Sequence, residues 1–457
     1  MIIDRATPPQ SKEQAVFHLP QIQQITLPSG LSGLFIEKAK LPMVQFMFVV
    51  STGSAMDAVG KSGLANLTAI LIDEGAGGLS ALELNNQFEM LGSSIQISIN
   101  HEFMYFTILS LEEKFSETLS LLGKIISQPH FEQNEFLREK SKVQAQLLNL
   151  KNEPDSIADR IFEEEVFGAS SKLGHLNLGK EKDVESLSND DVKNFYHSFI
   201  ETGMAGFVCA GSLKVDELKN LIQKHLDNRQ VGNNSDSPKL PIPEKKRRLY
   251  FVHKNNAQQT EIRIGNLSGR RRDTDFYAKT VMNTILGGQF NSRINFKLRE
   301  KKGFTYGATS YFAFRKECGY FLLTTSVQSE HTFEALKDIF YELKQIKNVI
   351  STEELEAAKL SIIRKFPSNF ETYYQLVSGL NTLYTYDLPA SYFNDYPSNI
   401  KAITIEDALT AAGDNINEEE MVAVLVGDKT AFRDLVGEFG FDEIIEMNEE
   451  GERLISL

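Results

Sequence analysis

Hydrophobic residues along the chain recur at the spacings of helices and strands, and glycines or prolines separate the runs. In the first half, the pattern predicts a hairpin over 25–37 and strands over 42–50, 95–100, 103–109 and 205–210. Predicted amphipathic helices span residues 62–74, 82–91, 115–126, 132–150, 155–167 and 187–199. Short strands interleaved with amphipathic helices indicate an α+β protein.

The second half of the chain repeats the pattern of the first. Three landmarks recur with similar neighbours after 217, 216 and 216 positions, namely Glu117 as Glu334, Asp191 as Asp407, and Gly211 as Gly427. Matches at a nearly constant offset predict an internal duplication. We therefore expect two homologous units, each a mostly antiparallel sheet with helices packed on one face.

A compositional break separates the two predicted units. Residues 228–248 are rich in Asn, Ser, Pro and charged residues and almost free of apolar ones, which is typical of a linker. The predicted boundaries are 1–227 for the first unit and 249–457 for the second. Two such units face each other across a groove, which is where we expect a partner or substrate to bind.

Composition narrows the class of protein. The formal net charge of −14 argues against a nucleic-acid binder or a protein of anionic membranes. No signal peptide is recognisable, and no apolar run approaches the roughly 18 residues that span a bilayer. Cys209 and Cys318 lie in apolar runs and are predicted to be buried free thiols. We therefore expect a cytoplasmic protein.

The stretch from Gly287 to Tyr311 contains candidate functional residues. Its pattern predicts a short helix, which begins at Asn291 or Ser292 and ends at Gly303, followed by a strand from 304 to 306. The apolar stripe of this helix is formed by Phe290, Ile294 and Leu298. Arg299 at the helix end and Tyr306 in the strand are then predicted to lie close together, although neither is needed to fill a core.

This stretch contains the pattern L-R-E-x-x-G-x-x-Y and resembles the inverted-zinc-motif peptidases, the family of pitrilysin and mitochondrial processing peptidase. The similarity extends from about Ile25 to Gly440, and the two-half bacterial branch is the nearest fit. It implies the sheet-and-helix architecture shared by LuxS and the processing peptidases. The matching positions are Gly53, Gly63-Leu64-Ala65 and Gly75 in the first half, and Gly287-Gly288, Ser292-Arg293, Leu298-Arg299-Glu300, Gly303 and Tyr306 in the second.

Active members of that family hold zinc through H-x-x-E-H on the first-half helix and a glutamate on a later helix. The corresponding residues here are Asn66, Ala69 and Ile70, with the later position at or near Gln146. Alanine and isoleucine have no ligating atom, and neutral amides are poor zinc ligands. No two of the eight histidines lie three or four residues apart, so none replaces the motif. The chain is therefore expected to bind no catalytic zinc and to be inactive alone.

The resemblance implies a role for the remaining pair. In the family, a tyrosine at the position of Tyr306 donates to the oxyanion formed from the peptide carbonyl, and an arginine at the position of Arg299 binds the substrate backbone. We expect this chain to be the zinc-free subunit of a heterodimer, in which a homologous partner holds zinc. The peptide substrate would add as a strand near residues 95–100.

Three alternatives remain open from the sequence. The chain resembles the structural core subunits of respiratory complexes as well, and these have no catalytic role. It could instead be a chaperone-like peptide-binding module that acts as a homodimer. For the pair itself, the structural alternative is that Arg299 caps its helix while Tyr306 packs at a strand end.

Overall fold

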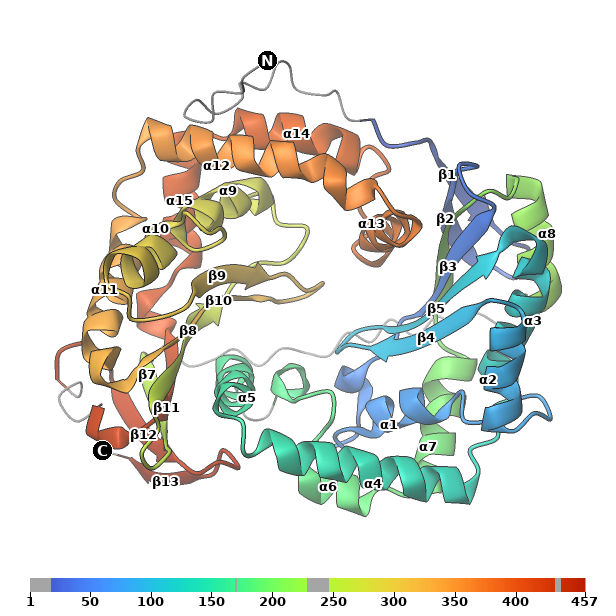
Figure 1. Cartoon of the computed structure of the whole chain (residues 1–457), viewed down its shortest axis with the longest axis horizontal. Coiled ribbons are helices and arrows are strands. Elements are labelled where there is room, and N and C mark those ends of the chain that lie inside the picture. Colours follow the sequence, from blue (N-terminus) through green and yellow to red (C-terminus); the bar gives the residue numbers. More distant parts are fainter. Residues whose placement is uncertain (1–17, 169–170, 228–245, 432–436, 457) are drawn as a thin grey trace, which may run out of the picture.

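The computed structural model describes residues 18–168, 171–227, 246–431 and 437–456 (Figure 1). The strands of the first half are β1 (Ile22–Thr26), β2 (Ser32–Glu37), β3 (Met43–Val50), β4 (Ser94–Ile99), β5 (Met104–Leu111) and β6 (Ala205–Gly211). Its helices are α1 (Leu64–Leu71), α2 (Ala81–Met90), α3 (Phe115–Ser127), α4 (Gln133–Leu150), α5 (Pro154–Phe167), α6 (Glu181–Ser186), α7 (Asn189–Phe195) and α8 (Val215–His225). The elements predicted for this half are all present, with ends shifted by a few residues.

The second half repeats most of this succession, but among the described residues it ends in two strands where the first half ends in a helix. Its strands are β7 (Arg248–His253), β8 (Gln259–Leu267), β9 (Ala308–Ala313), β10 (Tyr320–Gln328), β11 (Val422–Gly427), β12 (Glu443–Met447) and β13 (Arg453–Ser456). Its helices are α9 (Phe276–Leu286), α10 (Arg293–Asn295), α11 (Thr332–Gln345), α12 (Thr352–Lys365), α13 (Tyr373–Thr385), α14 (Tyr392–Ala402) and α15 (Ile405–Asn415). None of the helices in the described ranges is both long and apolar enough to cross a bilayer.

Two sheets of related topology organise the described residues. The strand order is β1-β2-β6-β3-β5-β4 in the first sheet and β13-β12-β7-β11-β8-β10-β9 in the second. The run β2-β6-β3-β5-β4 corresponds to β7-β11-β8-β10-β9, strand for strand. Pairing is antiparallel except between β2 and β6, β7 and β11, and β7 and β12. The prediction of two mostly antiparallel α+β units is therefore confirmed.

The duplication extends to single hydrogen bonds. Helix α7 begins with a capping box between Ser188 and Asp191, and α15 begins with the same box between Thr404 and Asp407. In such a box the hydroxyl and the carboxylate each accept a backbone N–H that the first helical turn leaves unpaired. The two boxes lie 216 positions apart, which is the offset found in the sequence. The predicted linker, 228–248, lies outside the described residues except for its last three, and Arg248 opens β7.

Each sheet is covered on one face by helices of its own half and on the other by one helix of the opposite half. Helix α13 of the second half packs on β2, β3 and β6, and α5 of the first half packs on β8 and β11. Figure 1 shows α13 beside the first sheet and α5 beside the second. The face of α13 turned to the first sheet is apolar and buried, and consists of Tyr373, Leu376, Val377, Leu380 and Leu383. Burial of each such side chain stabilises the fold by about 1.5–3 kcal/mol. The exchange of α5 and α13 between the halves therefore joins them firmly.

The exchange also explains the composition of the central strands. Strand β3 buries seven of its eight residues, because its own helices cover one face and α13 covers the other. A strand buried on both faces is continuously apolar rather than alternating. A second contact between the halves is polar: Arg160 of α5 donates from Nη1 to the carbonyl of Glu450 at 3.0 Å, in the β12–β13 turn. Lys151 pairs with the Glu450 carboxylate at 3.4 Å.

The close approach of α5 to the second sheet requires a glycine in β8. A Cβ at Gly265 would lie 1.9 Å from the Phe321 carbonyl oxygen and 2.8 Å from the ring of Phe162 on α5. We predict that Gly265→Ala lowers the free energy of unfolding by about 1–3 kcal/mol, because the strand and α5 must both shift. Urea denaturation of the purified chain measures this change.

The matched control is Gly413→Ala in α15, where no atom lies within 4 Å of the added carbon. That substitution should leave stability unchanged or raise it by up to about 1 kcal/mol, because alanine is the better helix former. An unaltered urea midpoint for Gly265→Ala would show that α5 does not pack closely on β8.

Candidate functional site

Helix α1 carries three of the four positions that hold zinc or its catalytic base in the resembled family. It follows Gly63, whose φ of 92° lies in the left-handed region. The Asp57 carboxylate accepts from the backbone nitrogens of Gly63 and Ala65, each at 2.8 Å, and so caps the helix start. Burial raises the pKa of Asp57 to about 7, against the opposing effect of these bonds.

The zinc positions on α1 present almost no ligating atoms. Ala69 is buried, and Ile70 is half-buried and packs against the hydrophobic core of the first half. Asn66 has a buried Nδ2 that finds no hydrogen-bond partner in the described part of the chain. Asn66, Ala69 and Ile70 thus replace a hydrophilic ligand set with one neutral amide and two hydrocarbon side chains, which cannot hold a zinc ion.

The fourth position, on α4, is solvent-exposed. The buried face of this helix consists of Phe136, Glu139, Val143 and Leu147, and Gln146 lies off it. The nearby Glu139 carboxylate is already paired, at 2.7 Å with Lys142 and 3.0 Å with Arg138. Within the ranges that the structure describes, no group of three or more His, Cys, Asp or Glu residues could hold a metal ion.

Histidines near α1 do not replace the missing ligands either. His101 is buried, and its Nε2 lies 2.9 Å from the carbonyl oxygen of His175. Burial lowers the pKa of His101 to about 3, which keeps its ring neutral at physiological pH. His101 is therefore a core residue with a satisfied hydrogen bond.

The second candidate region is the helix made of α10 and the π-helical turn Phe296–Lys301 that continues it. Cations on one side anchor it to the neighbouring helices. Arg293 binds Glu354 of α12 through two bonds of 2.6 and 2.7 Å, and Lys297 binds Glu342 of α11 at 2.9 Å. The helix ends as predicted at Gly303, which has a φ of 67°.

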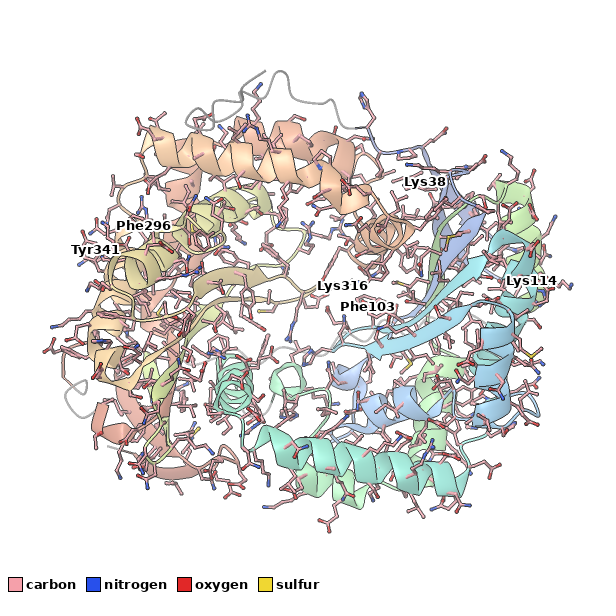
Figure 2. The ribbon with its side chains drawn as sticks, viewed as in Figure 1. Lys38, Phe103, Lys114, Phe296, Lys316 and Tyr341 are labelled. Carbon is pink, nitrogen blue, oxygen red and sulfur yellow. The ribbon has the colours of Figure 1, made fainter. Side chains whose placement is uncertain are left out.

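Arg299, on the next turn, is half-buried and rests on an aromatic ring. Its guanidinium carbon lies 4.6 Å from the ring centroid of Phe290, within the range of a cation–π contact. Its nearest carboxylate partner is Glu300, at 3.6 Å. Two exposed rings lie on the side of the anchoring Lys297 instead: its Nζ is 4.1 Å from the Tyr341 ring centroid, and Figure 2 shows Phe296 and Tyr341 near each other at the outer left edge of the molecule.

Tyr306 is 89% exposed and protrudes from a turn with a well-defined backbone. The Thr305 hydroxyl bonds both the nitrogen and the oxygen of Gly307, at 3.0 and 2.8 Å. Thr325 on β10 donates to the same Gly307 oxygen at 2.9 Å. The turn therefore fixes the backbone of Tyr306 while its phenol stays in water.

Two sequence predictions for this stretch are wrong. Phe290 does not belong to the buried stripe of Ile294 and Leu298, because it precedes the helix and is 57% exposed beneath Arg299. The following strand begins at Ala308 rather than at 304, because the Thr305 side chain bonds Gly307 and forms a turn there. The predicted cap is also incomplete: Ser292 occupies the N-cap position, but its side chain makes no capping bond.

The structure does not bring the two candidate regions together. Figure 1 shows α1 at the lower right and α10 with β9 on the left, on opposite sides of the molecule. No hydrogen bond, ion pair or ring contact joins Arg299 to Tyr306 within the described ranges. The reciprocal helices α5 and α13 hold the halves at this separation. The helical turn that carries Arg299 therefore lies apart from the α1 of its own chain.

The outer strands of the two sheets differ in one respect that bears on peptide binding. In β9, the nitrogen of Ser310 donates to Gly287 at 3.1 Å and its oxygen accepts from Asn283 at 2.9 Å, so that edge is occupied. In β4, Asn100 donates to Phe103, which makes the alternate residues 98, 96 and 94 the ones bonded to β5. Residues 95 and 97 consequently turn their backbone groups outward, and the edge of β4 can accept another strand.

Sequence reasoning missed the residues that support the pair. Phe290 was assigned to the core, and neither Asn295 nor Thr305 was recognised. Asn295 is a polar side chain buried between two apolar turns of the helix. An amide at such a position signals an internal hydrogen-bonded contact, because an unpaired buried amide is costly.

The chain has duplicated sheets, zinc positions without metal ligands, a half-buried Arg299 and an exposed Tyr306. These features define a metallopeptidase fold that lacks the metal ligands. Family models agree with this description. The model for Insulinase (Peptidase family M16) matches residues 34–175, and the model for the Peptidase M16 inactive domain matches 186–362. The chain belongs to the M16 peptidase family.

Individual proteins resemble the chain over most of its length. A Helicobacter pylori protein named Non-peptidase homolog YmxG is 24% identical over 381 residues, 82% of this chain and 86% of that one. An Uncharacterized zinc protease YmxG of Bacillus subtilis is 21% identical and covers 74% of this chain and 82% of its own. The crystal structure of a peptidase M16 inactive domain from Pseudomonas fluorescens superposes with a TM-score of 0.81 at 23% identity, over 89% of this chain and 98% of that chain.

We predict that the purified chain retains no stoichiometric zinc after incubation with the metal and dialysis, because Asn66, Ala69 and Ile70 offer one neutral amide where the family uses histidines and a carboxylate. Elemental analysis by mass spectrometry measures the metal content. One zinc per chain would contradict the interpretation of α1, and an Asn66→Ala variant would then show whether the metal is held there.

Proposed function

We propose that this chain is the zinc-free subunit of a heterodimeric zinc metallopeptidase, to which it contributes Arg299 and Tyr306. The observation that carries the proposal is the presentation of Tyr306: a tyrosine 89% exposed on a turn that three hydrogen bonds fix in place. Holding a backbone in one conformation costs entropy, and an aromatic side chain in water gains nothing from it within the chain itself. A fixed backbone at Tyr306 becomes useful when the phenol inserts into the surface of another molecule.

The partner is a homologous chain that carries the H-x-x-E-H motif. Zinc held by that chain would activate the water that attacks a peptide carbonyl. The Tyr306 hydroxyl has the chemistry to donate to the oxyanion that develops, and its donation strengthens as the charge grows. Arg299 offers a planar, permanently charged donor for a substrate carbonyl. The stack on Phe290 limits the orientations of the guanidinium before substrate arrives.

Three further observations support this division of labour. The zinc positions of this chain are occupied by residues that cannot bind the metal. The halves are joined through α5 and α13, so Arg299 and Tyr306 cannot fold back onto their own α1. A relative in Helicobacter pylori is named a non-peptidase homologue, which agrees with a chain that is inactive alone.

We predict that mixing this chain with the H-x-x-E-H homologue from the same organism produces peptidase activity that neither chain shows alone. Tyr306→Phe should then lower kcat by about 10²-fold, because one preformed oxyanion donor is worth about 3 kcal/mol. Turnover of a quenched fluorescent peptide measures kcat, and gel filtration checks that the complex still forms.

The matched control is Tyr374→Phe, which removes the hydroxyl of another exposed tyrosine, on α13. It should leave kcat unchanged. Equal turnover by the wild-type and Tyr306→Phe mixtures would exclude the catalytic role and leave a structural subunit, the alternative in which the pair has no function.

A chaperone-like peptide-binding protein is the second candidate function, and the free edge of β4 is the observation that favours it. Strand β4 has no charged residue, proline or bulge to block another strand. An extended peptide pairing with it would bond the outward groups of Ile95 and Ile97. This function needs no partner chain and is compatible with a homodimer.

The two functions differ in what the isolated chain does. If the chain is a peptide-binding protein, it binds a fluorescent unstructured peptide alone, and Ile97→Pro abolishes that binding by removing an outward N–H. Gln96→Pro is the contrasting variant, because it removes an N–H bonded to β5 and should lower stability instead. Under the heterodimer proposal, we predict at most weak binding by the isolated chain in an anisotropy titration, because the β4 edge alone, without the partner's zinc site, holds only the peptide backbone. Tight binding would favour the second function.

A further inference from the structure

One buried amide, Asn295, precedes Arg299 by four residues and bonds the segments on either side of Arg299 and Tyr306. Asn295 is the last residue of α10 and is only 4% exposed. Its side chain reaches the turn before the helix with one end and the strand after it with the other. Both of these bonds are to backbone groups, so they constrain the course of the chain rather than a side-chain rotamer.

The first bond fixes the aromatic platform under Arg299. The Nδ2 of Asn295 donates to the carbonyl oxygen of Phe290 at 2.7 Å. The turn around Phe290 is further held by the nitrogens of Gly287 and Gly288, which both donate to the Asn283 carbonyl, at 2.9 and 2.7 Å. These contacts place the Phe290 ring 4.6 Å from the guanidinium carbon of Arg299.

The second bond fixes the exit from the Tyr306 turn. The Oδ1 of Asn295 accepts from the backbone nitrogen of Ala308 at 3.0 Å, two residues after Tyr306. Ala308 is the first residue of β9 and would otherwise present an unpaired N–H at the sheet edge. The turn is thus held on one side by Thr325 and on the other by Asn295.

The amide suits both bonds at once. It has a donor and an acceptor on one planar group, whereas a carboxylate accepts only and a hydrocarbon does neither. Because the site is buried, no water readily replaces a lost partner, and each unmade bond leaves a costly unpaired group. The two functional side chains therefore share one support.

We propose that Asn295 is the positioning residue that sets Arg299 and Tyr306 in register with each other. This inference rests on the proposed function of the pair and adds the device that couples its two members. Asn295 touches neither substrate nor metal and acts only through the backbones of Phe290 and Ala308. A change at Asn295 should therefore disturb both members together, although they lie seven positions apart in the sequence.

A spectroscopic test separates this proposal from catalysis. The chain contains no tryptophan, so Phe290→Trp and Tyr306→Trp each introduce a single reporter. We expect time-resolved fluorescence anisotropy to gain a fast component at both reporters when Asn295→Leu is added. With Asn295→Asp, which still accepts from Ala308 but cannot donate to Phe290, the fast component should be confined to the reporter at 290.

Asn189→Leu is the matched control, since Asn189 is also buried and donates to a backbone carbonyl, that of Phe131, at 2.8 Å in the first half. It should lower stability without mobilising either reporter. If Asn295→Leu does not fold, the Asn295→Asp pair still decides the matter. Anisotropy decays unchanged by the foldable Asn295 variants would overturn the proposal.

Kinetics of the mixed chains then test the consequence. Asn295→Leu should lower kcat by about 10²-fold, the loss expected when a supporting residue lets catalytic groups move by about an ångström. Adding Tyr306→Phe to Asn295→Leu should cost less than it does in the wild-type chain, because the phenol is already misplaced. Mobile reporters with unaltered kcat would leave Asn295 a positioning residue but refute the catalytic role of the pair; full additivity of the two substitutions would refute the coupling.

Discussion

The packing of α13 on the first sheet and of α5 on the second is the contact on which the rest of the structure depends. Each helix leaves its own half to cover the open face of the other sheet, so neither core is complete without both halves. Gly265 records how close this approach is, since the ring of Phe162 occupies the space that a side chain would need. The chain consequently behaves as one body in which the two candidate regions are held apart.

The separation of α1 from the α10 helix bears directly on which site Arg299 and Tyr306 can serve. Because α1 and the α10 helix lie on opposite sides of the molecule, the roles proposed for Arg299 and Tyr306 require a zinc site on another chain. Under that proposal, Asn66, Ala69 and Ile70 remove a zinc site that this chain could not complete by itself. The second half of one chain would then meet the first half of the other, and only one zinc site needs to survive.

Much of the fold follows from local pattern, because helix and strand periodicities and the 216-residue offset are visible in the sequence itself. The exchange of α5 and α13 does not follow. An apolar stripe such as Leu376, Val377 and Leu380 shows that a face is buried but not which sheet buries it. The apolar run of β3 did contain a hint, since a strand covered on one face only would have alternated.

The candidate site was predicted less completely than the fold. The residue types and positions of Arg299 and Tyr306 were evident from the family pattern, but their supports were not. A side-chain bond from Thr305 converted three residues with strand propensity into a turn, and Phe290 left the helix to lie under a guanidinium. The Arg299–Phe290 contact joins residues nine positions apart, and the Thr305 bond is made by a side chain, so backbone propensity and spacing carry little information about either.

The proposed complex requires Tyr306 to lie at the zinc site of the partner chain. A photo-crosslinking amino acid, p-benzoylphenylalanine, placed at position 306 of this chain reports that location directly by mass spectrometry of the crosslinked peptides. If Tyr306 completes the partner's site, it will crosslink to the partner helix that carries H-x-x-E-H, or to residues beside it. A crosslink to a surface remote from that helix, or none in a complex that forms normally, would contradict that placement.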